Sequence, residues 1–108
     1  MAINYKNARL VLTTATTDLY TCPALTTAIV TLCQAANVTT AADKLTVSWT
    51  DASNGNAVTR LVNGTPVAAS EAQGVLVGKL VLEAGDKIRA SCATVNAIEI
   101  TASVVEFS

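Results

Sequence analysis

Apolar and polar side chains alternate along several segments of this 108-residue chain. In residues 44–50, Leu45, Val47 and Trp49 fall on one side of an extended chain, and the residues between them are Thr and Ser. Because successive side chains of a β-strand point to opposite faces, this period of two predicts a strand with one buried face, on which Trp49 is a core aromatic. The same alternation recurs, less cleanly in the first two, in residues 9–14, 57–62, 87–92 and 98–104.

Turn-forming residues separate these runs at roughly the spacing that indicates an antiparallel sandwich or barrel. The Asn-Gly pairs at 54–55 and 63–64 predict hairpin turns, because both residue types tolerate a positive φ. Gly85 predicts a further turn, so that residues 79–91 form a β-hairpin. The core-facing side chains of that hairpin are expected to be Leu80, Leu82, Ile88 and Ala90.

One longer segment, residues 26–38, is apolar at both parities. This is typical of a central strand covered on both sides or of a strand that carries a bulge. No part of the chain shows a convincing apolar repeat of 3.6 residues, so we expect an all-β fold. The prediction is an antiparallel β-sandwich, jelly-roll-like, with seven to eight strands in a single domain of residues 1–108. Residues 1–8 are expected either as an N-terminal arm or as a frayed terminus.

The composition bears on the partners of the protein. Charged residues are 14% of the chain, against about 25% in typical domains, and the net charge is -1. No block of like charges provides the electrostatic footprint of a nucleic-acid binder, so no nucleic-acid partner is expected. No segment approaches the roughly 18 apolar residues of a membrane span, and no signal peptide is recognisable. A chain this weakly charged is expected to cover part of its surface with partner chains.

Candidate chemistry is sparse. The chain has no histidine, the commonest general base and metal ligand, and we expect no catalytic residues, no metal and no cofactor. Cys22, Cys33 and Cys92 lack the Cys-x-x-Cys spacing and are expected as small buried hydrophobes, with a Cys22–Cys33 bridge left open. Residues 51–56 offer oxygen ligands, but they lack the calcium-loop spacing and are expected to form a hairpin turn.

Four segments carry a resemblance to a known group of proteins. "TDLYTCPALTTAIVTLCQAAN" (residues 17–37) is followed by "LTVSWTD" (45–51), "LVLEAGDKIRASCA" (80–93) and "IEITASVVEF" (98–107). This order resembles small β-sandwich virion proteins of tailed bacteriophages, over nearly the whole chain. The resemblance is carried by structural motifs and implies no catalytic residues.

The resemblance implies a structural virion protein, and a capsid decoration (cement) protein is the function that we expect. Such a protein would bind the major capsid protein on the outer capsid surface as a homo-oligomer, a trimer or a dimer, and stabilise the shell by bridging capsomers. It would be made in the host cytoplasm and located in the virion. Two alternatives stay open: a phage neck, tail or fibre-associated structural protein, and a carbohydrate-binding β-sandwich module.

Two regions are expected to make the contacts with partners. In the N-terminal segment, Tyr5, Lys6 and Arg9 are long enough to reach a neighbouring chain. The second region consists of two predicted loops, at residues 51–56 and 63–66. The loop residues expected to contribute are Asp51, Asn54, Asn63 and Pro66.

Overall fold

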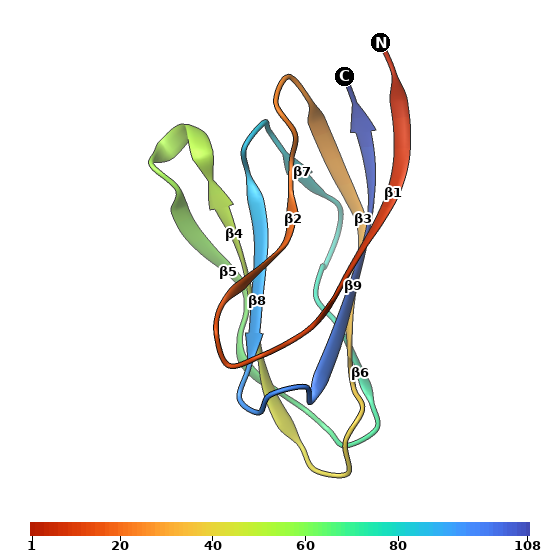
Figure 1. Cartoon of the computed structure of the whole chain (residues 1–108), viewed down its shortest axis with the longest axis vertical. Helices are drawn as coiled ribbons and strands as arrows, with labels where there is room; N and C mark the ends of the chain where they lie inside the picture. Colours follow the sequence, from red (N-terminus) through yellow and green to blue (C-terminus); the bar gives the residue numbers. More distant parts are fainter.

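The computed structural model describes residues 1–108 and consists of two antiparallel β-sheets packed face to face (Figure 1). In the five-stranded sheet the strand order is β1-β9-β3-β6, and β7 also pairs with β3; in the four-stranded sheet the order is β2-β8-β4-β5. A short 3-10 turn, Ala52–Asn54, follows β4, and no helix is long and apolar enough to cross a membrane. The strands are β1 (Ile3–Val11), β2 (Thr17–Thr21), β3 (Thr27–Asn37), β4 (Asp43–Asp51), β5 (Ala57–Val67), β6 (Ala72–Gly74), β7 (Leu80–Leu82), β8 (Lys87–Cys92) and β9 (Ile98–Phe107).

The predicted fold class, an all-β antiparallel sandwich, is confirmed, with nine strands in place of seven to eight. The strand β6, which has three residues, was not predicted, whereas β7 coincides with the first strand of the predicted 79–91 hairpin. With only Ala72, Gln73 and Gly74, β6 has no pair of alternating large apolar residues by which a period of two could be recognised.

The core lies between the inward-facing rows of the two sheets. Leu45 and Val47 are fully buried, and Trp49 packs against the same core, as the alternation in β4 predicts. In β3 the register to β9 shifts between Val30 and Leu32, which places a bulge in the segment that is apolar at both parities. The bulge was one of the two interpretations of that segment.

The predicted hairpin of residues 79–91 is wrong, although its core-facing residues are correct. β7 pairs with β3 in one sheet, whereas β8 pairs with β2 and β4 in the other. The turn at Gly85, with φ of 88°, therefore carries the chain across from one sheet to the other. Leu82 and Ile88 are both fully buried, because a strand facing the core shows the same alternation whichever sheet it joins.

The predicted turn at residues 63–66 is also wrong, because this segment lies inside β5. The register between β4 and β5 shifts there, and Gly64 has φ of 62°. The Gly64 N–H donates to the Thr46 hydroxyl over 3.0 Å in place of a ladder carbonyl. The Asn-Gly pair thus supplies the positive φ of a β-bulge and not that of a hairpin turn.

The two termini lie side by side at one end of the sandwich (Figure 1). Ala2 and Ser108 exchange two backbone hydrogen bonds of 2.9 and 3.0 Å, and the residues of β1 pair with β9 from Ile3↔Phe107 to Val11↔Glu99. Most of the proposed N-terminal arm is therefore an edge strand of the larger sheet. Whether that strand contacts a neighbouring chain stays a prediction.

Candidate functional site

The outward face of the five-stranded sheet carries an apolar row that crosses four strands. Tyr5 of β1 stands opposite Val105 of β9, Val105 opposite Ile29 of β3, and Ile29 opposite Val81 of β7. Directly opposite residues of an antiparallel pair lie on the same face, so these side chains are neighbours. Tyr5 is 81% exposed and Val81 56%. With the adjoining apolar residues they form what we call the apolar band: Ile3, Tyr5, Ile29, Leu32, Val81, Val105 and Phe107.

The strand β1 forms the open edge next to this band. It pairs with β9 on one side and with no strand along the other. An unpaired edge presents a row of backbone donors and acceptors to which another chain can add a strand. Of the predicted contact residues, Tyr5 and Arg9 lie on the outward face of β1, at the two-residue spacing that places them on one side.

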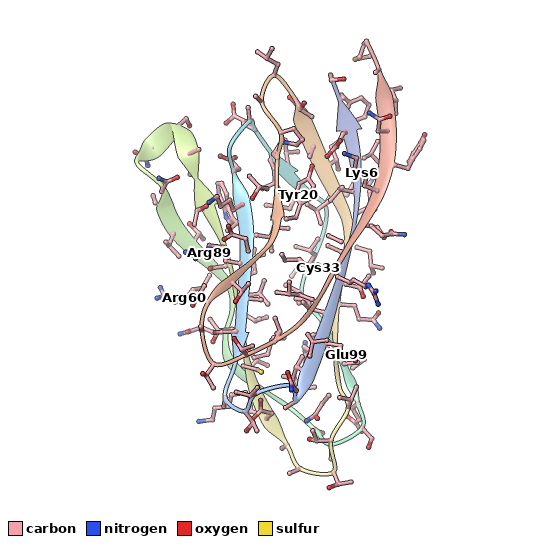
Figure 2. The ribbon with its side chains drawn as sticks, viewed as in Figure 1. Lys6, Tyr20, Cys33, Arg60, Arg89 and Glu99 are labelled. Carbon is pink, nitrogen blue, oxygen red and sulfur yellow. The ribbon has the colours of Figure 1, made fainter.

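Lys6 lies on the opposite face of β1, directed toward the second sheet. Its Nζ is 3.0 Å from Oε1 of Glu106, and the hydroxyl of Tyr20 donates to Oε2 of the same carboxylate over 2.5 Å. Figure 2 shows Lys6 and Tyr20 at the end of the sandwich where the termini meet. The three residues connect β1 and β9 to β2 of the other sheet, so the structure separates Lys6 from Tyr5 and Arg9.

The electrostatics of this triad follow from burial and from the hydrogen bond. Glu106 is 3% exposed, and its pKa is lowered chiefly by the Tyr20 hydroxyl, with a further contribution from Lys6. The pKa of Tyr20 is raised by burial and by the neighbouring carboxylate. At neutral pH the arrangement is therefore a charged carboxylate held by a phenol and an ammonium, which stabilises the junction between the sheets.

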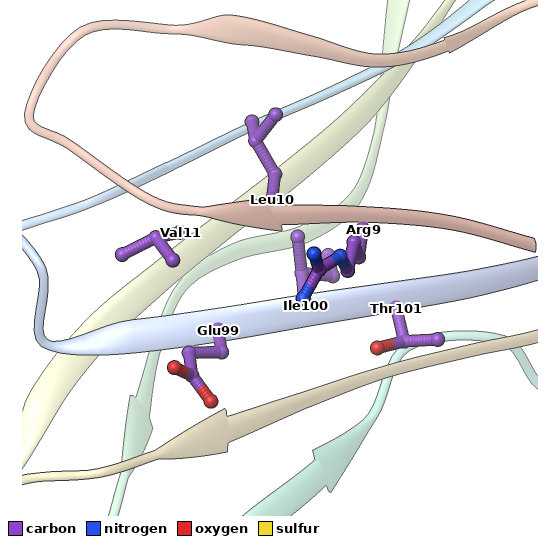
Figure 3. A pocket seen from close by; sticks show the side chains of 6 residues that line it. All are labelled: Arg9, Leu10, Val11, Glu99, Ile100 and Thr101. Atoms are coloured by element: carbon purple, nitrogen blue, oxygen red, sulfur yellow. The ribbon is translucent and has the colours of Figure 1, made fainter.

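A hollow of about 530 Å³ lies over the pair β1 and β9 (Figure 3). Its lining includes Arg9, Val11, Glu99 and Thr101, at facing positions of the two strands. Glu99 is the only carboxylate there, whereas glycoside hydrolysis uses a pair. The hollow thus offers no paired-carboxylate chemistry, and the predicted lack of enzymatic activity remains a prediction.

The predicted loop residues lie apart from one another. Asp51 ends β4 and Asn54 belongs to the short 3-10 turn, so both stand at the tip that joins β4 to β5. Asn63 and Pro66 are exposed positions within β5. The structure therefore does not gather the four into one surface.

At the β4–β5 tip, oxygen atoms of Asp51, Glu83 and Asp86 lie within 4.8 Å of one another. Both oxygens of Asp86 accept backbone N–H groups, from Ala52 and from Glu83, each at 2.9 Å. Asp51 accepts the hydroxyl of Ser53 at 2.9 Å. These hydrogen bonds give the buried carboxylate of Asp86 a structural role, which is to connect this tip to the turn before β8.

The three cysteines are free and buried, so the Cys22–Cys33 bridge that the sequence left open is absent from the structure. Figure 2 shows Cys33 between the two sheets. Burial raises the pKa of Cys33 to about 11, and it also raises the pKa values of Cys22 and Cys92. A raised pKa lowers the fraction of thiolate, which is the nucleophile, and burial limits access to it, so all three cysteines are expected to be unreactive.

We expect the folded protein to resist thiol labelling. At pH 8 a thiol with a pKa of about 11 is about one part in a thousand thiolate, and burial restricts access further. The protein unfolded in urea should take up three maleimide labels, one for each free cysteine. In the same time the native protein should take up fewer than one label per chain on average, as counted by mass spectrometry. Rapid native labelling at any of the three positions would contradict the buried placement.

No protein-family model matches the chain, and no curated protein sequence matches it. Two solved structures share its fold. One, from Bacillus endospore appendages that form a novel family of disulfide-linked pili, has a TM-score of 0.56 and 10% sequence identity, over 99% of this chain and 87% of that one. The other, from the T13 viral particle of IBDV, has a TM-score of 0.57 and 7% identity, over 96% of this chain. The present chain spans 30% of that viral chain.

At these identities the similarity establishes the fold. The chain is a β-sandwich of two antiparallel sheets, similar in architecture to a protein of a viral particle and to a protein of a pilus. The apolar band lies on its five-stranded sheet, beside the open edge of β1.

Proposed function

We propose that this protein is a structural virion protein of a tailed bacteriophage, a capsid decoration protein that binds the outer surface of the major capsid protein as a homo-oligomer. It stabilises the shell by bridging neighbouring capsomers. The observation that carries the proposal is the apolar band, a row of exposed or half-exposed apolar side chains across four strands. The resemblance of residues 17–107 to small phage virion proteins and the fold shared with a viral-particle protein support it.

The composition of the band suits a contact between proteins. Contiguous exposed apolar surface is rare on soluble monomers and marks sites of association. The cores of protein interfaces are depleted in charged residues and enriched in aromatic ones, and the band has Tyr5 and Phe107 and no charge of its own. The adjoining edge of β1 adds backbone groups that can extend the sheet into a neighbour. Many equivalent weak contacts at symmetric positions of a shell then add up to firm attachment.

The first alternative, a neck, tail or fibre-associated protein, would use the same band against a different partner. The two assignments differ in copy number on the particle. The second alternative, a carbohydrate-binding module of the kind considered from the sequence, would stack a sugar on an aromatic side chain at the surface. Trp49, the residue considered for that role, packs against the core.

The test is binding to purified phage shells that lack the protein, with electron microscopy to locate and count the bound copies. Val81→Glu places a charge in the apolar band, and Val95→Glu places the same charge at an equally exposed valine in a loop, each being 56% exposed in the native chain. We expect wild type and Val95→Glu to cover the shell in hundreds of copies, and Val81→Glu to bind at least about tenfold more weakly.

Each other result has a defined meaning. A few bound copies, or a single ring at the tail, would indicate a neck, tail or fibre-associated protein and not a capsid decoration protein. Full shell binding by Val81→Glu, with an unchanged melting temperature, would remove the apolar band as the contact surface. The mass of the free chain in solution, measured at several concentrations, tests the homo-oligomer.

A further inference from the structure

The outer face of the four-stranded sheet has the opposite chemistry to the apolar band. A hollow of about 230 Å³ lies there, and seven of its eight lining residues are polar. The polar residues include two arginines and several Ser and Thr hydroxyls, whereas Val58 is the one hydrophobic member. No carboxylate lines it, so the hollow offers mainly hydrogen-bond donors and positive charge.

Strand register brings the two arginines to either side of one serine. Ser48 of β4 stands opposite Arg60 of β5 and opposite Arg89 of β8. Neighbouring strands are about 4.8 Å apart, so the backbones carrying the two guanidinium groups are separated by about 10 Å across the hollow. Figure 2 shows both arginines on the same flank of the sandwich.

The two arginines differ in how they are held. The Nε of Arg89 donates to Asp18 over 2.7 Å, and its Nη2 donates to the Thr16 carbonyl over 3.4 Å. Asp18 also pairs with Lys87 at 3.3 Å, so its charge is shared. Arg60 takes part in none of the three ion pairs of the molecule and is exposed. Arg89 is thus fixed in place, and Arg60 is free to close on a bound anion.

An unpartnered hydroxyl lines the same hollow. Thr50 is 5% exposed, and its Oγ1 is the one buried side-chain polar atom in the protein without a hydrogen-bond partner. It lies two residues beyond Ser48 on β4 and lines the hollow beside it. Buried polar groups are nearly always paired in folded proteins, and one that is not indicates a functional or solvent-filled site.

The chemistry of the lining selects a ligand class. A guanidinium matches a carboxylate with two parallel hydrogen bonds, and Ser and Thr hydroxyls both donate and accept, as sugar hydroxyls do. The volume corresponds to about eight waters and is below that of a drug-sized pocket, which suits one sugar ring. We propose that this hollow binds an acidic monosaccharide unit, with a uronic acid as its simplest form, the carboxylate meeting Arg60 and the ring hydroxyls meeting Thr50 and Ser48.

The site is separate from the apolar band, since the two lie on the outer faces of different sheets. A protein attached to a shell through the band would leave the hollow open to solvent. The inference therefore stands or falls independently of the capsid role, and Val81→Glu is expected to bind the sugar as wild type does.

The experiment is a calorimetric titration of the full chain at low salt with glucuronate, glucose and inorganic phosphate. We expect glucuronate to bind more tightly than either of the others, and Arg60→Ala to weaken it at least tenfold. Thr50→Val keeps the side-chain shape but removes the hydroxyl, and should weaken glucuronate binding severalfold without loss of melting temperature. Arg9→Ala, on the outward face of β1, is the matched arginine control and should bind as wild type does.

Three results would overturn the proposal. They are no heat of binding with glucuronate, glucuronate binding unaffected by Arg60→Ala, and phosphate binding as tight as that of glucuronate. Equally tight binding of phosphate would indicate a simple anion site in which the Ser and Thr hydroxyls do not contact a sugar.

Discussion

Replacing Asp86 with alanine is expected to lower the free energy of unfolding by about 2–4 kcal/mol. Asp86 is 2% exposed, and its two oxygens each accept a backbone N–H at 2.9 Å, from Ala52 and from Glu83. Alanine leaves both N–H groups without this acceptor, and hydrogen bonds to a charged group are the stronger kind. Urea unfolding measures the loss, with an unchanged m-value as the check that the folded state persists.

The position of Asp86 in the fold explains the size of this effect. The turn at Gly85 takes the chain from β7 in one sheet to β8 in the other, and a Cβ on Gly85 would approach Ala52 to 3.0 Å. The carboxylate of Asp86 therefore connects the crossing between sheets to the β4–β5 tip. No strand pairing joins β7 directly to β8, so the crossing is held by the side-chain hydrogen bonds of Asp86 together with three backbone hydrogen bonds among Cys22, Glu83, Gly85 and Asp86.

Two further variants make this prediction specific. Asn at position 86 retains one acceptor oxygen, so Asp86→Asn should recover about half of the loss, because one of the two N–H groups regains a partner. Asp51→Ala is the matched control, since Asp51 accepts a single hydroxyl in the same cluster, and it should change stability by less than about 0.5 kcal/mol. A comparable loss in Asp51→Ala would assign the stability to the cluster as a whole and contradict the role of Asp86.

The alternation of apolar and polar residues predicted the fold class because burial of one face is a local property of a strand. It gave the inward positions of Leu82 and Ile88 correctly and still assigned them to one hairpin. The two residues face the core from different sheets. The sheet to which a strand belongs depends on its pairing with strands distant in the sequence, and the alternation within one strand carries no information about that pairing. The Asn63-Gly64 pair shows the same limit, because a bulge and a hairpin turn both require a positive φ.

The sequence predicted the candidate surfaces only in part. Tyr5 and Arg9 were anticipated, but the apolar band also needs Ile29 and Val105, whose neighbourhood arises from the pairing of β3 with β9. A signal did exist in adjacent apolar residues such as Val104 and Val105, one of which must face outward. The hollow had no such signal, because it depends on the register of β5, β4 and β8 around Ser48.

The second large effect is expected at Glu106, where β9 is connected to Tyr20 of the other sheet and to Lys6 of β1. Glu106→Ala should lower the free energy of unfolding at pH 7 by about 2 kcal/mol, because the half-buried Tyr20 hydroxyl loses its acceptor and Lys6 its counter-charge. Glu99→Ala, an exposed glutamate on the same strand, is the matched control and should change stability by less than about 0.5 kcal/mol.

The effect at Glu106 should also depend on pH in a defined direction. The Tyr20 hydrogen bond, and secondarily Lys6, hold the pKa of Glu106 below its usual 4.5, so the folded state binds this proton less readily than the unfolded chain. The stabilisation is therefore present above pH 4.5 and is lost as the pH falls through the lower pKa of the folded state.

Comparison with Glu106→Gln isolates this contribution from the other carboxylates. Glutamine does not titrate, so its stability deficit relative to wild type should be largest near pH 7 and should shrink as the pH approaches 3. Glu99→Gln should show no such convergence. A deficit in Glu106→Gln that stays constant from pH 7 to pH 3 would mean that packing at this junction, and not the charge on Glu106, holds the two sheets together.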